Sequence, residues 1–114
     1  MIKLKILIVD DEIDYCMIMK TYFQSRQYEV YLAFTLADGL NQLKSVKPDI
    51  LFLDNNLPDG KGWSNVESIV ENNPHLKIYL VSAHHQKGEL FSDPPNNVVI
   101  WEKPLSLSFL KEVF

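Results

Sequence analysis

The sequence predicts an α/β domain in which helices cover both faces of a parallel sheet. Short segments rich in Ile, Leu and Val alternate with segments whose apolar residues recur every three or four positions. Such alternation of strands and helices is typical of parallel sheets with right-handed crossover connections. The 114 residues are enough for one domain with its own core. We therefore expect a single domain over residues 1–114.

Five strands are expected from short, nearly continuous apolar runs, which are typical of strands buried on both faces of a parallel sheet. They cover residues 5–10, 28–33, 49–54, 77–82 and 97–101. Residues 56–62 between the third strand and the next helix are rich in turn-forming types and predict a loop.

The first two helices are predicted by apolar periodicity and by a start signal. One apolar face is expected to contain Tyr15, Ile18, Met19, Tyr22 and Phe23. Thr35 followed by Asp38 is similar to a capping box, and a second helix marked by Leu36, Leu40 and Leu43 follows.

Two further helices complete the alternation. Val66, Ile69 and Val70 mark a third helix that ends at residues 72–74, and a short last helix over 106–114 is expected to start at Ser106. This last helix ends with the chain at Phe114, which is consistent with a further domain beyond it.

The segment between the fourth and fifth strands, residues 83–97, lacks a regular apolar stripe. Gly88 weakens a helix and Pro94-Pro95 ends one. We expect a shortened or irregular helix anchored by Leu90 and Phe91, which is either a static loop or an output surface ordered through Ser82.

The composition excludes several functional classes. The net charge of −4 and the absence of a basic patch argue against direct nucleic-acid binding. The single cysteine, Cys16, excludes an intramolecular disulfide and fits a reducing compartment. The N-terminal apolar run is too short for a signal peptide or a membrane span. We expect a cytoplasmic protein that does not bind membranes.

Polar side chains follow the expected strands at the points where they end. The first strand ends in Asp10-Asp11, the third in Asp54, the fourth in Ser82, and the fifth runs into Lys103. Ligands of open α/β sheets bind at these carboxyl ends. Clustered carboxylates are relieved by a divalent cation such as Mg²⁺, and an Asp can itself be a nucleophile. The set predicts phosphoryl transfer.

These segments resemble the receiver domain of bacterial two-component response regulators. The resemblance rests on "ILIVDDE", "PDILFLDNNLPDGKG" with Pro58 and Gly62, "VSA" and "EKP". It implies a flavodoxin-like doubly wound five-stranded parallel sheet of order 2-1-3-4-5. Strands one and three are neighbours in that order, which brings Asp10, Asp11 and Asp54 together.

The resemblance also implies a role for each site residue. Asp54 would accept a phosphoryl group from a phosphohistidine on a sensor histidine kinase or phosphotransfer protein. Mg²⁺ would be bound by Asp10 (partly through water), Asp11, Asp54 and the backbone carbonyl of Asn56. Ser82 would bond a phosphoryl oxygen, Lys103 would bridge Asp54 or the phosphate, and the Lys103-Pro104 bond would be cis. The output domain or partner is not indicated.

Three further features concern the aromatic switch, the lifetime of the phosphoryl group and a second possible metal site. The family usually has Tyr or Phe three residues before the lysine, where this chain has Ile100, followed by Trp101. Trp101 is interpreted as packing in preference to a switch. His84 and Asn56 occupy positions similar to those that tune phosphate lifetime in the family, and polar surface residues are the alternative. A metal site at His84 and His85 is disfavoured because adjacent residues of an extended segment point apart.

Two other functions compete with a phosphorylated switch. A Mg²⁺-dependent phosphatase resembling the haloacid dehalogenases needs an acid two residues after its nucleophile, and that position is Asn56 after Asp54. After Asp10 it is Glu12, but the following Gly-Thr is missing. A phosphorylation-independent interaction module on the same fold is the other alternative.

Overall fold

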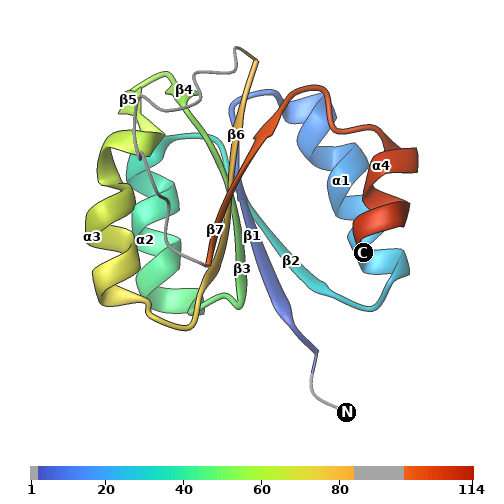
Figure 1. Cartoon of the computed structure of the whole chain (residues 1–114), viewed down its shortest axis with the longest axis horizontal. Coiled ribbons are helices and arrows are strands. Elements are labelled where there is room, and N and C mark those ends of the chain that lie inside the picture. Colours follow the sequence, from blue (N-terminus) through green and yellow to red (C-terminus); the bar gives the residue numbers. More distant parts are fainter. Residues whose placement is uncertain (1–2, 84–96) are drawn as a thin grey trace.

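A parallel sheet of five strands forms the centre of the protein in the computed structural model, which describes residues 3–83 and 97–114 (Figure 1). Its order is β2-β1-β3-β6-β7, which is 2-1-3-4-5 when the five strands of the sheet are counted along the chain, as expected. The strands are β1 (Lys5–Val9), β2 (Glu29–Ala33), β3 (Ile50–Asp54), β6 (Lys77–Ser82) and β7 (Val98–Glu102).

Helices cover both faces of this sheet. Figure 1 shows α1 (Ile13–Ser25) and α4 (Leu107–Val113) on one side, and α2 (Leu36–Val46) and α3 (Val66–Asn72) on the other. The Thr35 hydroxyl accepts a hydrogen bond from the Asp38 amide (3.1 Å), and the Ser106 hydroxyl accepts one from the Phe109 amide (3.1 Å). Both predicted helix starts are therefore confirmed. The expected short helix with Leu90 and Phe91 lies outside the described residues, as do His84 and His85.

The buried face of α1 differs from the expected one at Ile18, whose side chain is 54% exposed. Met19, Tyr22 and Phe23 are buried as expected, and Cys16 is buried in place of Ile18. A helix turns about 100° per residue, so Ile18 lies about 200° around the axis from Cys16. The periodicity indicated the helix correctly, but including Ile18 in its buried face was wrong.

Two apolar clusters fill the spaces between the sheet and its helices. All five residues of β3 are buried, as expected for a central parallel strand. Among the described residues, the buried polar or charged ones are Asp10, Asp54 and Ser82. All three lie at or just after the carboxyl ends of strands, so the polar groups that fold into the interior are concentrated at one edge of the sheet.

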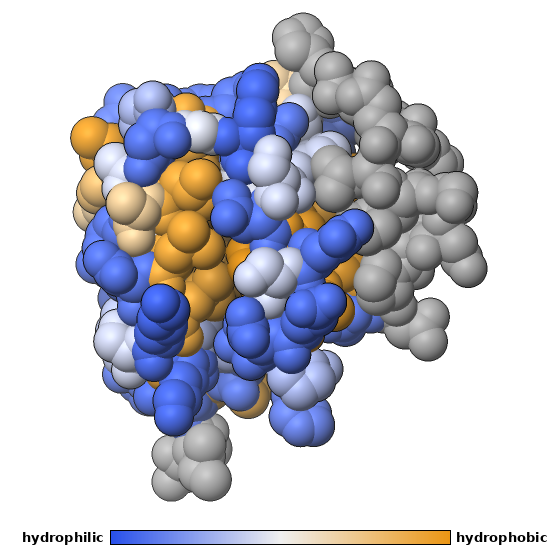
Figure 2. Space-filling view, turned by 90° about the vertical axis from the view of Figure 1, so that its left-hand side faces the viewer, coloured by the Kyte–Doolittle hydropathy of each residue, from blue (hydrophilic) through white to orange (hydrophobic). Residues whose placement is uncertain are grey.

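A surface groove of about 820 Å³ lies between α2 and α3. Its lining includes the apolar side chains of Leu40, Leu43, Ile69 and Leu76. Figure 2 shows apolar surface flanked by hydrophilic residues on this face. Pro48 and Pro74, which come just before β3 and β6, also line it, so the groove reaches the amino ends of the strands. The groove is therefore remote from the carboxyl ends of the strands, where Asp10 and Asp54 lie and which we call the acidic edge. No helix in the described part of the chain is long and apolar enough to cross a membrane.

Candidate functional site

Three carboxylates gather where β1 and β3 end. The two strands are parallel neighbours with Val9 opposite Leu53, so Asp10 follows β1 beside Asp54. One carboxylate oxygen from each of Asp10, Asp11 and Asp54 lies within 4.8 Å of the others. Asp10 and Asp54 are buried, whereas Asp11 is exposed. The structure thus brings together the three acids that the strand-end pattern predicted.

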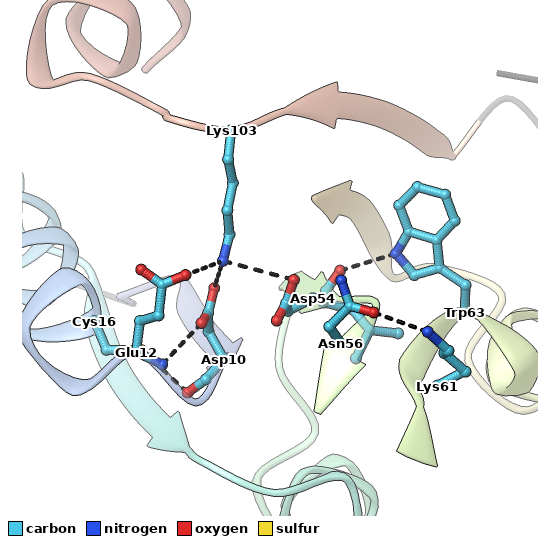
Figure 3. A network of polar contacts seen from close by, with 9 residues as sticks. Asp10, Glu12, Cys16, Asp54, Asn56, Lys61, Trp63 and Lys103 are labelled. Carbon is cyan, nitrogen blue, oxygen red and sulfur yellow. Dashed lines mark hydrogen bonds and ion pairs between the residues drawn. The ribbon is translucent and has the colours of Figure 1, made fainter. Parts of the chain in front are cut away.

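Lys103 reaches into this cluster from the end of β7 (Figure 3). Its Nζ lies 2.7 Å from Asp10 Oδ2, 3.1 Å from Glu12 Oε1 and 3.6 Å from Asp54 Oδ1. The Lys103 amide donates to the Ser82 carbonyl at 2.8 Å, which ties the ends of β6 and β7 together. The Lys103-Pro104 bond is cis, as the resemblance implied. Lys103 is closer to Asp10 than to Asp54, its expected partner.

The charges in the site perturb one another. Burial, reinforced by the charge of Asp10, raises the pKa of Asp54 to about 6, although Lys103 and the Asn56 amide oppose the shift. Burial lowers the pKa of Lys103, but its hydrogen bond with Asp10 and the charges of Asp10 and Asp54 outweigh burial and raise it overall. At neutral pH the site therefore contains a charged lysine and a mostly ionised Asp54.

The loop expected after β3 contains a small hairpin, β4 (Asn56–Leu57) and β5 (Gly60–Lys61), followed by the 3₁₀ helix η1 (Gly62–Asn65). The Asp59 carboxylate in its turn accepts hydrogen bonds from the Leu36 and Ala37 amides, at 2.7 and 2.9 Å. These contacts attach the hairpin to the N-terminus of α2. They also lower the pKa of Asp59, because they stabilise its ionised form.

Gly62 is needed for close packing against the strand end. A Cβ atom added at Gly62 would lie 2.2 Å from the carbonyl oxygen of Asp54. The indole Nε1 of Trp63 donates to the Leu53 carbonyl at 3.3 Å. Together these contacts hold η1 directly against the end of β3.

Two residues that contact the site were not predicted from the sequence to do so. Glu12 accepts from Lys103 at 3.1 Å, and its position directly after Asp10-Asp11 was the available signal. Lys61 donates to the Asn56 side chain at 2.9 Å (Figure 3). No sequence signal predicts that contact, because it depends on the hairpin pairing of Asn56 with Lys61.

Ser82 is buried at the end of β6, the strand next to Asp54. On the adjacent strand, Ile100 packs with the cluster on the α2 and α3 side, whereas Trp101 packs on the opposite side. The Trp101 ring stacks on Tyr79 with centroids 4.4 Å apart and meets Phe109 edge-on at 4.7 Å. These contacts support the interpretation of Trp101 as a packing residue.

The fold and the acidic edge define an α/β protein with a charged site between β1 and β3, the point at which the order of the strands in the sheet reverses. The sequence matches the response regulator receiver domain over residues 6–92. It is 33% identical over 88 residues to the chemotaxis protein CheY of Listeria monocytogenes, covering 75% of this chain and 72% of that protein. The chain belongs to the response regulator receiver domain family, whose members are signalling modules.

Other similar proteins are longer or have solved structures. The transcriptional regulatory protein ZraR of Salmonella typhimurium is 28% identical over 81 residues, which are 71% of this chain but only 18% of ZraR. The response regulator TrrA of Thermotoga maritima, solved in complex with Mg(2+)-BeF, has a TM-score of 0.81 and 27% identity, with 96% of this chain and 95% of that chain covered. A structure of the histidine kinase ThkA in complex with TrrA matches with a TM-score of 0.79 and 25% identity, over 96% of this chain and 94% of that one.

Proposed function

We propose that this receiver domain is phosphorylated on Asp54 by a histidine kinase or phosphotransfer protein and thereby switches its interaction with an output domain or partner. The observation that carries the proposal is the buried carboxylate of Asp54 beside two further acids, with the Lys103 ammonium 3.6 Å from its oxygen. Because the pKa of Asp54 is about 6, most of this carboxylate is ionised at neutral pH and can act as a nucleophile.

The donor set fits a magnesium ion. Mg²⁺ prefers hard oxygen ligands, and the carboxylates of Asp10, Asp11 and Asp54 supply oxygens within 4.8 Å of one another. We assign these three side chains and the Asn56 backbone carbonyl as its ligands. When bound, Mg²⁺ supplies positive charge that offsets the carboxylates and the phosphoryl oxygens. The TrrA complex with Mg(2+)-BeF supports magnesium binding by similarity.

The chain's own residues then divide the work of phosphoryl transfer. An oxygen of Asp54 forms a bond to phosphorus while the bond between phosphorus and the donor's histidine nitrogen breaks. Lys103, which is charged and mostly buried, neutralises negative charge on the phosphoryl group. Ser82, at the neighbouring strand end, donates its hydroxyl to a phosphoryl oxygen. The domain catalyses only its own phosphorylation and dephosphorylation, and we place it in the cytoplasm.

Intact-mass measurement after incubation with acetyl phosphate and Mg²⁺ tests the assignment. The wild-type protein and the Asp14→Asn variant, which alters an exposed acid of α1, are expected to gain one phosphoryl group. The Asp54→Asn variant is expected to gain none. A phosphoryl adduct that persists in Asp54→Asn would show that another residue is the acceptor.

A further inference from the structure

The side chain of Asn56 lies at the edge of the site between Asp54 and Lys61 (Figure 3). Lys61 Nζ donates a hydrogen bond to Asn56 Oδ1 at 2.9 Å. An ammonium group can donate but cannot accept, so it fixes which end of the amide it contacts. The oxygen of the Asn56 amide faces Lys61, and the NH₂ group is directed away from it.

The backbone around this pair holds both residues in place. Asn56 and Lys61 are directly paired across the β4–β5 hairpin, whose turn is attached to α2 through Asp59. The Gly62 amide donates to the Asn55 carbonyl at 3.1 Å, which fixes the residues that flank the pair. The contact between Lys61 and Asn56 is therefore built on a constrained hairpin.

We propose that Lys61 is a positioning residue that sets the lifetime of the phosphoryl group by fixing the orientation of the Asn56 amide. This inference rests on the proposed phosphorylation of Asp54. Dephosphorylation adds water to phosphorus and breaks the bond between phosphorus and the Asp54 oxygen. One proton of the water stays on the released phosphate, and the other leaves to solvent.

The orientation of the amide decides how Asn56 acts in that step. With its oxygen held by Lys61, Asn56 presents NH₂ donors, which can bond a phosphoryl oxygen but cannot accept a proton from the incoming water. Without Lys61 the amide is free to turn its oxygen toward the water and orient it for attack. Loss of the lysine should therefore shorten the lifetime of the phosphorylated state.

The test compares rates of phosphate loss from protein labelled with acetyl phosphate and Mg²⁺. Lys61→Met is expected to lose phosphate about two- to tenfold faster than wild type, the range for an exposed charge-assisted hydrogen bond. Lys61→Arg, which keeps a charged donor, is expected to stay close to wild type. Lys44→Met, which changes an exposed lysine in the last turn of α2, is the matched control and should change nothing.

A double-mutant cycle separates positioning from a direct effect of charge. In an Asn56→Ala background, Lys61→Met is expected to have no further effect on the rate. An effect of the same size in that background would show that Lys61 acts through its own charge, and would overturn the proposal. Unequal melting temperatures of Lys61→Met and Lys44→Met would identify a rate change caused by loss of structure and count against it as well.

A second measurement does not depend on phosphorylation. Side-chain ¹⁵N relaxation of the Asn56 NH₂ group is expected to show a rigid amide in wild type and a more mobile one in Lys61→Met. Equal mobility in both proteins, or an unchanged lifetime in a protein that is phosphorylated normally, overturns the role of Lys61 and leaves the proposed function intact. Absence of any adduct in wild type overturns the proposed function itself, and the lifetime role with it.

Discussion

Replacement of Asp54 by Asn is expected to stabilise the metal-free protein at neutral pH. The pKa of Asp54 is raised from about 3.8 to about 6, mainly by burial and secondarily by the charge of Asp10. Ionisation of this carboxyl in the folded protein is therefore unfavourable compared with the unfolded chain. An amide at the same position occupies similar space and carries no charge.

The size of the effect follows from the pKa difference. A rise in the pKa from about 3.8 to about 6 corresponds to an upper figure of about 3 kcal/mol, at about 1.4 kcal/mol for each tenfold change in the proton affinity. The site opens to solvent beside the exposed Asp11, so screening reduces this figure. The opposing attraction of Lys103 is already contained in the net shift. We expect Asp54→Asn to raise the free energy of unfolding by about 1–2 kcal/mol at pH 7.

The sign of the pH dependence is fixed by the direction of the shift. Below about pH 4 the carboxyl is protonated in both the folded and unfolded states, so the wild type has no penalty there. The penalty develops as the pH rises from about 4 to about 6 and is complete at pH 7. The advantage of Asp54→Asn should accordingly be near zero at pH 4 and largest at pH 7.

Urea denaturation at several pH values, with and without Mg²⁺, measures these quantities. Asp14→Asn is the control, and a surface change of this kind should stay within about 0.5 kcal/mol of wild type. Saturating Mg²⁺ should stabilise the wild type more than Asp54→Asn, because a ligand of the native state adds stability by mass action. A variant that is less stable than wild type at pH 7, or an advantage that does not shrink toward pH 4, would refute the reasoning.

Three further predictions concern the structure around the site. Gly62→Ala places a Cβ atom 2.2 Å from the Asp54 carbonyl oxygen. It should lower the free energy of unfolding, measured in urea, by more than about 2 kcal/mol. A variant as stable as wild type would contradict this close contact. Trp101→Ala should lower the free energy of unfolding by about 2–3 kcal/mol and Trp101→Phe by about 1 kcal/mol, because the indole packs between Tyr79 and Phe109. Equal losses of stability in the two variants would argue against ring packing. Cys16 is buried with a pKa raised to about 12 by burial and by Asp10, so a thiol reagent should label it slowly in the native protein and rapidly in urea; rapid native labelling would contradict its burial.

The sheet and the acidic edge were predictable from the sequence for the same physical reason. Parallel strands must be covered on both faces, so their apolar runs are conspicuous, and a carboxylate that ends such a run, like Asp54, stands out. The order of the strands came from the resemblance, and it brought Asp10 and Asp54 together. Periodicity was less reliable at Ile18, because it indicates a helix better than it fixes which side of the helix is buried.

The hairpin after Asp54 could not be predicted in the same way. Turn-forming residues indicate that the chain reverses, but two-residue strands leave no periodic pattern. Asp59 contacts residues of α2 that lie 22 and 23 positions earlier in the chain. Lys61 contacts Asn56, five positions earlier. Both depend on the three-dimensional path of the turn, which local sequence preferences do not determine.

The distances of Lys103 from its partners indicate how charge is balanced in the resting site. Its ammonium is 2.7 Å from Asp10 and 3.1 Å from Glu12, but 3.6 Å from Asp54. Its charge therefore mainly compensates Asp10 and Glu12. Asp54 is left only partly compensated, which agrees with its raised pKa. A phosphoryl group on Asp54 would add negative charge within reach of the same lysine. Because Glu12 is exposed and its pairing is weakened by solvent, Lys103 can leave it at little cost and turn toward the phosphoryl group. Such a movement of one ammonium group between acids would connect phosphorylation of Asp54 to the end of β7.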